Sequence, residues 1–228
     1  MKKILLPIFL SILLTASAQQ KDVTTFLGIP VDGSLPSMVQ KLKAKGFIDE
    51  GHGILSGKFN DQDVLLSIIT YKNKVCRIMV WEKTPWTETD IKIRFNTLCH
   101  QFENSNKYIR AYDEDYFIPK DEDISYEMQI HNKRYDATFL QKIDETKTDL
   151  RQKINEKLLQ KYTEAQIEDP TEEEAEEMSC IVDDVIYDVI NDVVRNKCVW
   201  FTIMKDTGRY YIVMYYDNNH NRSEGDEL

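Results

Sequence analysis

Three segments with the alternating pattern of a β-strand follow one another with very short polar connections, and this feature restricts the fold more than any other. The segments cover residues 54–59, 63–71 and 74–82. Asn60-Asp61-Gln62 and Lys72-Asn73 join them. Connections this short link antiparallel neighbours, because parallel strands need a long crossover. The chain is therefore expected to build an antiparallel meander.

Two further strand pairs are expected later in the chain. They cover residues 123–131, 134–142, 197–204 and 208–216. Asn132-Lys133 joins the first pair, and Asp206-Thr207-Gly208 joins the second. In residues 123–131, apolar residues from Ile124 to Ile130 alternate with polar ones, which indicates a strand with one buried face. The sheet then has about seven strands.

Two helices are expected among these strands, at residues 34–46 and 87–105, because apolar residues recur there at helical spacing. The sequence predicts an α+β protein: an antiparallel sheet in hairpins and meanders, with helices packed on one face. Residues 19–228 are expected to form one domain. The order of helices and strands also allows two related halves, 19–106 and 107–228, although no sequence repeat supports them.

Residues 144–194 are charge-rich and are expected to form a helical insertion. After Met178 a strong apolar stripe runs to Val193, while several aspartates occupy other positions of the helix. A helix with this stripe must bury a face against something. Either the protein's own sheet or the groove of a partner protein would serve.

The first 18 residues have the three parts of a cleavable signal peptide. Lys2 and Lys3 precede an apolar run, and Ala16-Ser17-Ala18 is a small-residue cleavage site. The run is too short for the roughly 20 residues of a membrane-spanning helix. The mature protein is therefore expected to begin near Gln19 and to be periplasmic or secreted, with no membrane span after cleavage.

The chain is acidic, with 39 Asp and Glu residues against 29 Lys and Arg residues and a net charge of −10. Removal of residues 1–18 would take away two lysines and make the balance more negative. An acidic surface repels the phosphates of nucleic acids and anionic lipids, so neither is an expected partner.

The four cysteines permit two alternatives. In an exported protein an even number of cysteines is compatible with disulfides, here in three connectivities. The other alternative is free thiols that act as small apolar residues. The cysteines are Cys76, Cys99, Cys180 and Cys198.

The motifs of several catalytic and cofactor-binding classes are missing. The sequence has no G-x-S-x-G nucleophile elbow, no phosphate-binding glycine loop and no C-x-x-C pair. No two of its four histidines lie near each other in the sequence, as a zinc site on one helix would require. Catalytic residues, a metal and a cofactor are therefore not predicted.

The last strand is unusually aromatic, and its alternation divides the aromatic residues between two faces. Tyr210 and Tyr216 fall on one face, and Tyr211 and Tyr215 fall on the other. One face is expected in the core. The other is a candidate binding platform, formed by Tyr211 and Tyr215 with Trp200 of the preceding strand. Cross-strand packing beneath the helices is the alternative role for these residues.

Two segments resemble uncharacterised secreted proteins of Bacteroidetes bacteria. They are FLGIPVDGSLPSMVQKLKAKGF near the start and VWFTIMKDTGRYYIVMYYDNNHNRSEGDEL at the end. The resemblance covers about a third of the chain and implies export and a shared fold, but no catalytic residue. The alternation of a helix with antiparallel strands is also loosely similar to β-lactamase-inhibitor-like and outer-membrane assembly lipoprotein modules, in architecture alone.

Three hypotheses for the function follow. The first is a non-enzymatic binding module of the bacterial envelope whose partner is a protein or a glycan. The second is an exported hydrolase of glycans or peptides whose catalytic groups converge only in the fold, in a pocket with perturbed pKa values. The third is a purely structural envelope component, which would associate with itself.

Overall fold

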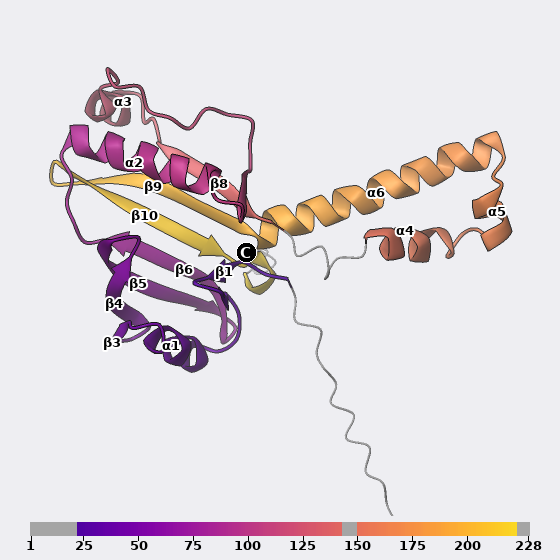
Figure 1. Cartoon of the computed structure of the whole chain (residues 1–228), viewed down its shortest axis with the longest axis horizontal. Coiled ribbons are helices and arrows are strands. Elements are labelled where there is room, and N and C mark those ends of the chain that lie inside the picture. The colour runs from indigo at the N-terminus through magenta and orange to yellow at the C-terminus, as the bar shows by residue number, and fades with distance from the viewer. Residues whose placement is uncertain (1–21, 143–149, 223–228) are drawn as a thin grey trace, which may run out of the picture.

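A computed structural model of the chain describes residues 22–142 and 150–222, so the expected signal peptide lies outside the described residues. The fold is α+β, as predicted, and is built on an antiparallel sheet with the strand order β3-β4-β5-β6-β10-β9-β8-β7 (Figure 1). The strands of this sheet are β3 (Ile48–Gly51), β4 (Ile54–Phe59), β5 (Gln62–Tyr71), β6 (Lys74–Glu82), β7 (Tyr108–Arg110), β8 (Asp136–Gln141), β9 (Cys198–Asp206) and β10 (Arg209–Asp217).

Helices and short elements surround this sheet. The short strands β1 (Thr25–Phe26) and β2 (Ile29–Pro30) pair with each other. The helices are α1 (Leu35–Lys43), α2 (Glu88–Glu103), α3 (Ile124–Ile130), α4 (Leu150–Leu158), α5 (Glu164–Glu168) and α6 (Glu172–Asn196), and a 3-10 turn, η1 (Asn219–Asn221), follows β10.

The sheet is assembled from two runs of elements with the same order. In the first run α1 precedes β3, β4, β5 and β6, and in the second α2 precedes β7, β8, β9 and β10. The last strand of each run pairs with the other, β6 against β10, in the middle of the sheet. The second run carries two additions: α3 between β7 and β8, and α4, α5 and α6 between β8 and β9.

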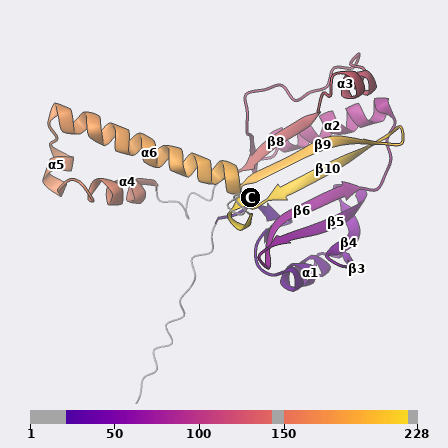
Figure 2. The same ribbon diagram turned by 180° about the vertical axis from the view of Figure 1, so that it is seen from behind.

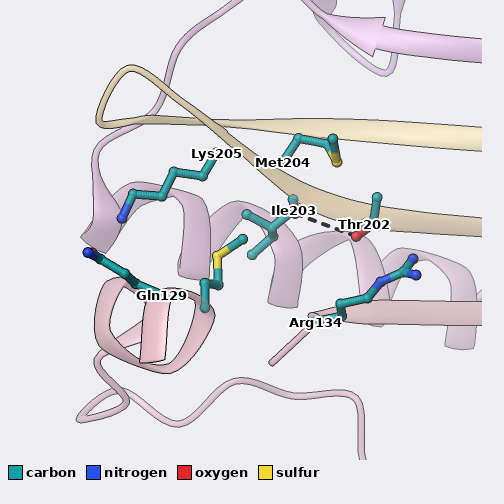
Figure 3. A pocket seen from close by; sticks show the side chains of 7 residues that line it. Gln129, Arg134, Thr202, Ile203, Met204 and Lys205 are labelled. Carbon is teal, nitrogen blue, oxygen red and sulfur yellow. Dashed lines mark hydrogen bonds between the residues drawn. The ribbon is translucent and has the colours of Figure 1, made fainter. Parts of the chain in front are cut away.

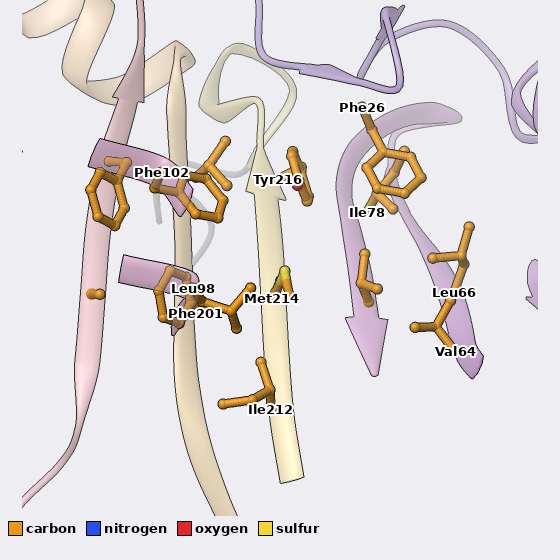
Figure 4. Close-up of a cluster of buried hydrophobic side chains, with 14 of the residues drawn as sticks. Phe26, Val64, Leu66, Ile78, Leu98, Phe102, Phe201, Ile212, Met214 and Tyr216 are labelled. Carbon is orange, nitrogen blue, oxygen red and sulfur yellow. The ribbon is translucent and has the colours of Figure 1, made fainter. Parts of the chain in front are cut away.

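The hydrophobic core lies on one face of the sheet, beneath α1 and α2. Figures 1 and 2 show α2 lying along β9 and β10 on one side of the sheet. In the close-up of the core, Phe102 and Leu98 of α2 lie beside Phe201 of β9 (Figure 4). The Phe102 and Phe201 ring centroids are 5.4 Å apart. Burial of this apolar area is the main stabilising term of the fold.

The hairpins at 54–82 and at the end of the chain form as predicted, but residues 123–131 are not a strand. They form α3, and only Ile124 of that helix is buried. Tyr126 and Ile130 are 51% and 55% exposed. The alternation was misleading because the Asp123 side chain caps a helix by accepting a hydrogen bond from the Tyr126 amide. Asn132-Lys133 is therefore not a hairpin joint, and β8 pairs with β7 and β9 instead.

Strands β3 and β7 were not predicted. Strand β3 forms one edge of the sheet and β7 forms the other, and neither contains a buried residue. An edge strand with no buried face has no alternating pattern for the sequence to reveal.

A buried ion pair ties α2 to the centre of the sheet. Both the Nε and an Nη atom of Arg94 donate to Glu82 Oε1, at 2.9 and 2.5 Å. Trp86 Nε1 donates to Glu82 Oε2 at 3.2 Å. The side chains of Glu82 and Arg94 are only 1% and 10% exposed. Each of these two buried charges therefore needs the other to offset the free energy of its removal from water.

Replacing Glu82 by alanine is expected to lower the free energy of unfolding by about 3–5 kcal/mol, because Arg94 would stay buried without its counter-charge. Urea denaturation followed by circular dichroism measures the loss. Asp63→Ala is the control, since the Lys58–Asp63 pair is 78% and 65% exposed and its removal should cost no more than about 1 kcal/mol. Equal losses for the two variants would contradict the role of the buried pair.

Candidate functional site

The face of the sheet opposite α1 and α2, which we call the open face, carries the candidate site. Side chains alternate along each strand, so the residues between the core positions of β6, β9 and β10 point to this face. Its central part is rich in aromatic, aliphatic and sulfur-containing side chains. They are Arg77, Met79, Trp81, Trp200, Thr202, Met204, Tyr211, Val213 and Tyr215.

Trp200 and Tyr215 form the first aromatic pair of the open face. They are direct partners across β9 and β10. Their ring centroids lie 4.0 Å apart, and the ring planes differ by 15°, so the rings are stacked. Trp200 Nε1 donates a hydrogen bond of 2.9 Å to Asp217 Oδ2. This bond and the stack fix the orientation of the Trp200 indole.

Arg77 holds the other side of this pair. Its Nε and an Nη atom donate to the two carboxylate oxygens of Asp217 at 2.5 and 2.8 Å. Its guanidinium carbon lies 4.8 Å from the Tyr215 ring centroid, within the range of a cation–π interaction. Burial lowers the pKa of Arg77, but the hydrogen bond and charge of Asp217 outweigh it and raise that pKa above its usual value.

The second aromatic pair is formed by Trp81 of β6 and Tyr211 of β10, whose ring centroids are 5.7 Å apart at an angle of 47°. Tyr211 lies opposite Met204 of the neighbouring strand β9. Buried Val213 lies between the two tyrosines on β10 and opposite Trp81. The two aromatic pairs therefore lie on the same face of the central strands, with Val213 between Tyr211 and Tyr215.

The hydroxyl group of Tyr215 remains a neutral hydrogen-bonding group at physiological pH. Burial raises the pKa of Tyr215, while the nearby charges of Arg77 and Arg134 lower it, and the net direction is upward. Tyr215 therefore contributes a ring and a neutral hydroxyl rather than a charge.

A hollow of about 590 Å³ adjoins the open face beside the start of β8 (Figure 3). Its lining includes Met128 and Gln129 of α3 together with Thr202, Ile203 and Met204 of β9. The pairing of β8 with β9 begins beside the hollow, with Asp136 opposite Thr202. Next to this pair, the Ile203 amide of β9 donates a hydrogen bond of 3.1 Å to the Tyr135 carbonyl.

Two basic side chains border the hollow, and both already have a partner. Arg134 Nε lies 3.1 Å from Asp136 Oδ2. Lys205 Nζ donates to Ser125 Oγ at 3.2 Å. The hollow can therefore receive an apolar group beside a weakly cationic rim.

The predicted platform residues Tyr211, Tyr215 and Trp200 lie on the same open face, with Trp200 stacked on Tyr215. Trp81 and Asp217, which complete the arrangement, were not among the predicted site residues. The alternation along β6 is by itself enough to put Trp81, Met79 and Arg77 on one face. The missing information was that β6 pairs with β10, since no local signal specifies a partner strand so far along the chain.

All four cysteines are free thiols in the structure. Cys76 and Cys99 are buried, Cys198 is half-buried and Cys180 is exposed on α6. Burial raises the pKa of Cys99 to about 12 and that of Cys198 to about 12, and it also raises the pKa of Cys76. These three positions fit the alternative in which cysteines serve as small apolar residues.

The hydrolase hypothesis requires a pocket with titratable groups of perturbed pKa. Within the described residues, a pocket of about 590 Å³ is lined by Tyr108 and Tyr216, with Lys107, Lys142 and Lys197 around them. Burial raises the pKa values of both tyrosines, so both remain protonated at neutral pH. The described lining includes no Asp or Glu that could act as a general base.

Residues 22–142 and 150–222 hold no group of three or more His, Cys, Asp or Glu side chains arranged for a metal ion. None of the helices described there has both the length and the apolar character needed to cross a membrane.

No protein-family model, no curated protein and no solved structure matches the chain.

Cys180 is expected to be the one thiol that alkylates readily in the native protein at pH 8. The raised pKa values of Cys76, Cys99 and Cys198 keep these groups as unreactive neutral thiols. Mass spectrometry after iodoacetamide treatment should show one modified cysteine in the native protein and four in guanidinium chloride. Fewer than four modified cysteines in non-reducing denaturant would indicate a disulfide instead.

Proposed function

We propose that the protein is an exported, non-enzymatic binding module, and that a protein partner docks on the open face of its sheet. The observation that carries this proposal is the pair of aromatic clusters on that face. Trp81, Trp200, Tyr211 and Tyr215 are each half-buried, lie on adjacent strands and remain in contact with solvent. Aromatic, methionine and arginine side chains are enriched at protein interfaces, and Trp, Tyr and Arg supply most of the residues that dominate binding energy.

The arrangement is also rigid before any partner binds. Asp217 accepts hydrogen bonds from Arg77 and Trp200, and its side chain is only 5% exposed. Side chains fixed in this way lose little conformational entropy on binding, which favours affinity.

A protein surface suits this face better than a glycan. A sugar ring stacks on the exposed face of an aromatic ring, whereas Trp200 and Tyr215 turn ring faces toward each other. The stacked pair therefore presents ring edges beside Met79, and Met204 lies farther along β9, opposite Tyr211. The hollow beside Met204 would accept an apolar side chain of the partner.

Export of the module is supported by the first 18 residues and by the resemblance to secreted proteins of Bacteroidetes. The acidic composition agrees with a protein partner rather than nucleic acid. In this proposal the protein works in the periplasm or outside the cell.

Alanine at both Tyr211 and Tyr215 should reduce capture of the partner from an envelope extract of the host at least about tenfold, because each lost aromatic contact removes a kilocalorie or more of binding energy. Quantitative mass spectrometry of the captured proteins measures the change. Tyr112→Ala is the matched control, since Tyr112 is 56% exposed outside the open face. Capture by the double variant at the level of the Tyr112 variant would exclude the open face as the docking site.

The mature protein is expected to begin near Gln19 and to be found outside the cytoplasm, because Ala16-Ser17-Ala18 lies where signal peptidase cleaves. Cell fractionation with N-terminal sequencing tests this. Recovery of the intact chain with Met1 from the cytosol would refute export.

A further inference from the structure

Residues 150–196, which we call the arm, form a helical hairpin that extends away from the sheet. In Figures 1 and 2, the C-terminal end of α6 meets the start of β9, and α4 lies alongside α6. The arm has a small apolar cluster of its own, formed by Leu158, Tyr162 and Met178. Of the two alternatives that the sequence left open, the protein's own sheet does not cover the apolar stripe of α6, because only the last residues of the helix adjoin the sheet.

The apolar surface of α6 is wider than the part that α4 covers. Helix α6 has 25 residues and α4 has nine. Met178 and Val185, on the side of α4, are each 8% exposed. Ile186, Ile190 and Val194 lie outside this contact and are 36%, 54% and 37% exposed. The apolar surface of α6 thus continues beyond α4.

These three residues belong to a row whose two halves differ in character. Residues spaced three or four apart lie on one side of a helix. The row along α6 is Glu172, Glu176, Ser179, Asp183, Ile186, Ile190 and Val194. Its first half is acidic and its second half is aliphatic.

The acidic half is as accessible as the aliphatic half. Glu172, Glu176 and Asp183 are all exposed. None of these three carboxylates forms a hydrogen bond or an ion pair with another residue in the described part of the chain. Hydrogen bonds from Thr171 and Gln166 go to Glu174 instead, which is off the row.

The charge pattern argues against a second copy of the chain as the occupant of this row. In an antiparallel pair of α6 helices, Glu172 and Glu176 would face the aliphatic half of the other copy. In a parallel pair the acids would face each other. The arm also has 13 acidic and five basic residues, so two arms would repel each other.

We propose that the row on α6 is a docking surface for an amphipathic helix of a partner protein, with lysines or arginines along one half and aliphatic residues along the other. Such a helix would lie beside Ile186, Ile190 and Val194 and set its cations against Glu172, Glu176 and Asp183. This surface is separate from the open face, so either proposal can fail without the other.

Two synthetic helical peptides test the proposal on the full mature chain. Both have the same aliphatic half, and the other half carries lysines in one peptide and glutamates in the other. Fluorescence anisotropy should show the lysine peptide binding at least about tenfold tighter, and Ile190→Gln should weaken its binding by about tenfold. Because Ile190 is 54% exposed, this substitution should leave the helix folded, as circular dichroism can verify.

A charge reversal identifies the acidic half. The double variant Glu176→Lys/Asp183→Lys should reverse the preference toward the glutamate peptide. The matched control Glu173→Lys/Asp184→Lys makes the same change in net charge at exposed positions off the row and should keep the preference for lysine. Three results would overturn the proposal: equal binding of both peptides, reversal by the control, or a dimer in light scattering that Ile190→Gln dissociates.

Discussion

The pairing of β6 with β10 is the constraint on which the rest of this structure depends. It joins two four-stranded meanders through residues that are far apart in the chain, as the Arg77–Asp217 contact across 140 residues shows. Without it each meander would have an exposed edge and half a core. The same pairing sets the register that puts Trp81 beside Val213 and Met79 beside Tyr215, so the sheet's continuity and the aromatic surface have one cause.

Because α1 and α2 pack on the same side, the sheet has two chemically different faces. On the core face, Phe95 of α2 and Phe201 of β9 are fully buried. On the open face, the largest side chains support one another: Trp200 stacks on Tyr215, and Arg77 neutralises Asp217. A face that is apolar, ordered and uncovered by α1 or α2 is what a docking surface requires, and it motivates the proposed function.

The arm is an insertion that the sheet tolerates easily. The last residue of β8 and the residue before β9 remain adjacent, since the Gln141 amide donates to the Lys197 carbonyl at 2.9 Å. Closing a long loop costs only slightly more entropy than closing a shorter one, so the arm does not weaken the β8–β9 ladder. With its own cluster around Met178, it presents a second surface without disturbing the first.

Local patterns in the sequence determined much of this protein: the hairpins at 54–82 and 197–216, helices α1 and α2, the two faces of β10, and the amphipathic character of α6. These features depend on spacing and turn residues within a few positions, so a single sequence reveals them. The strand expected at 123–131 failed because a capping aspartate favoured a helix there. Only the tertiary structure decided that β6 meets β10, that Trp81 and Asp217 join the predicted Tyr211, Tyr215 and Trp200, and that α6 points away from the sheet. Each of these depends on contacts between distant segments, whose free energy no local pattern encodes.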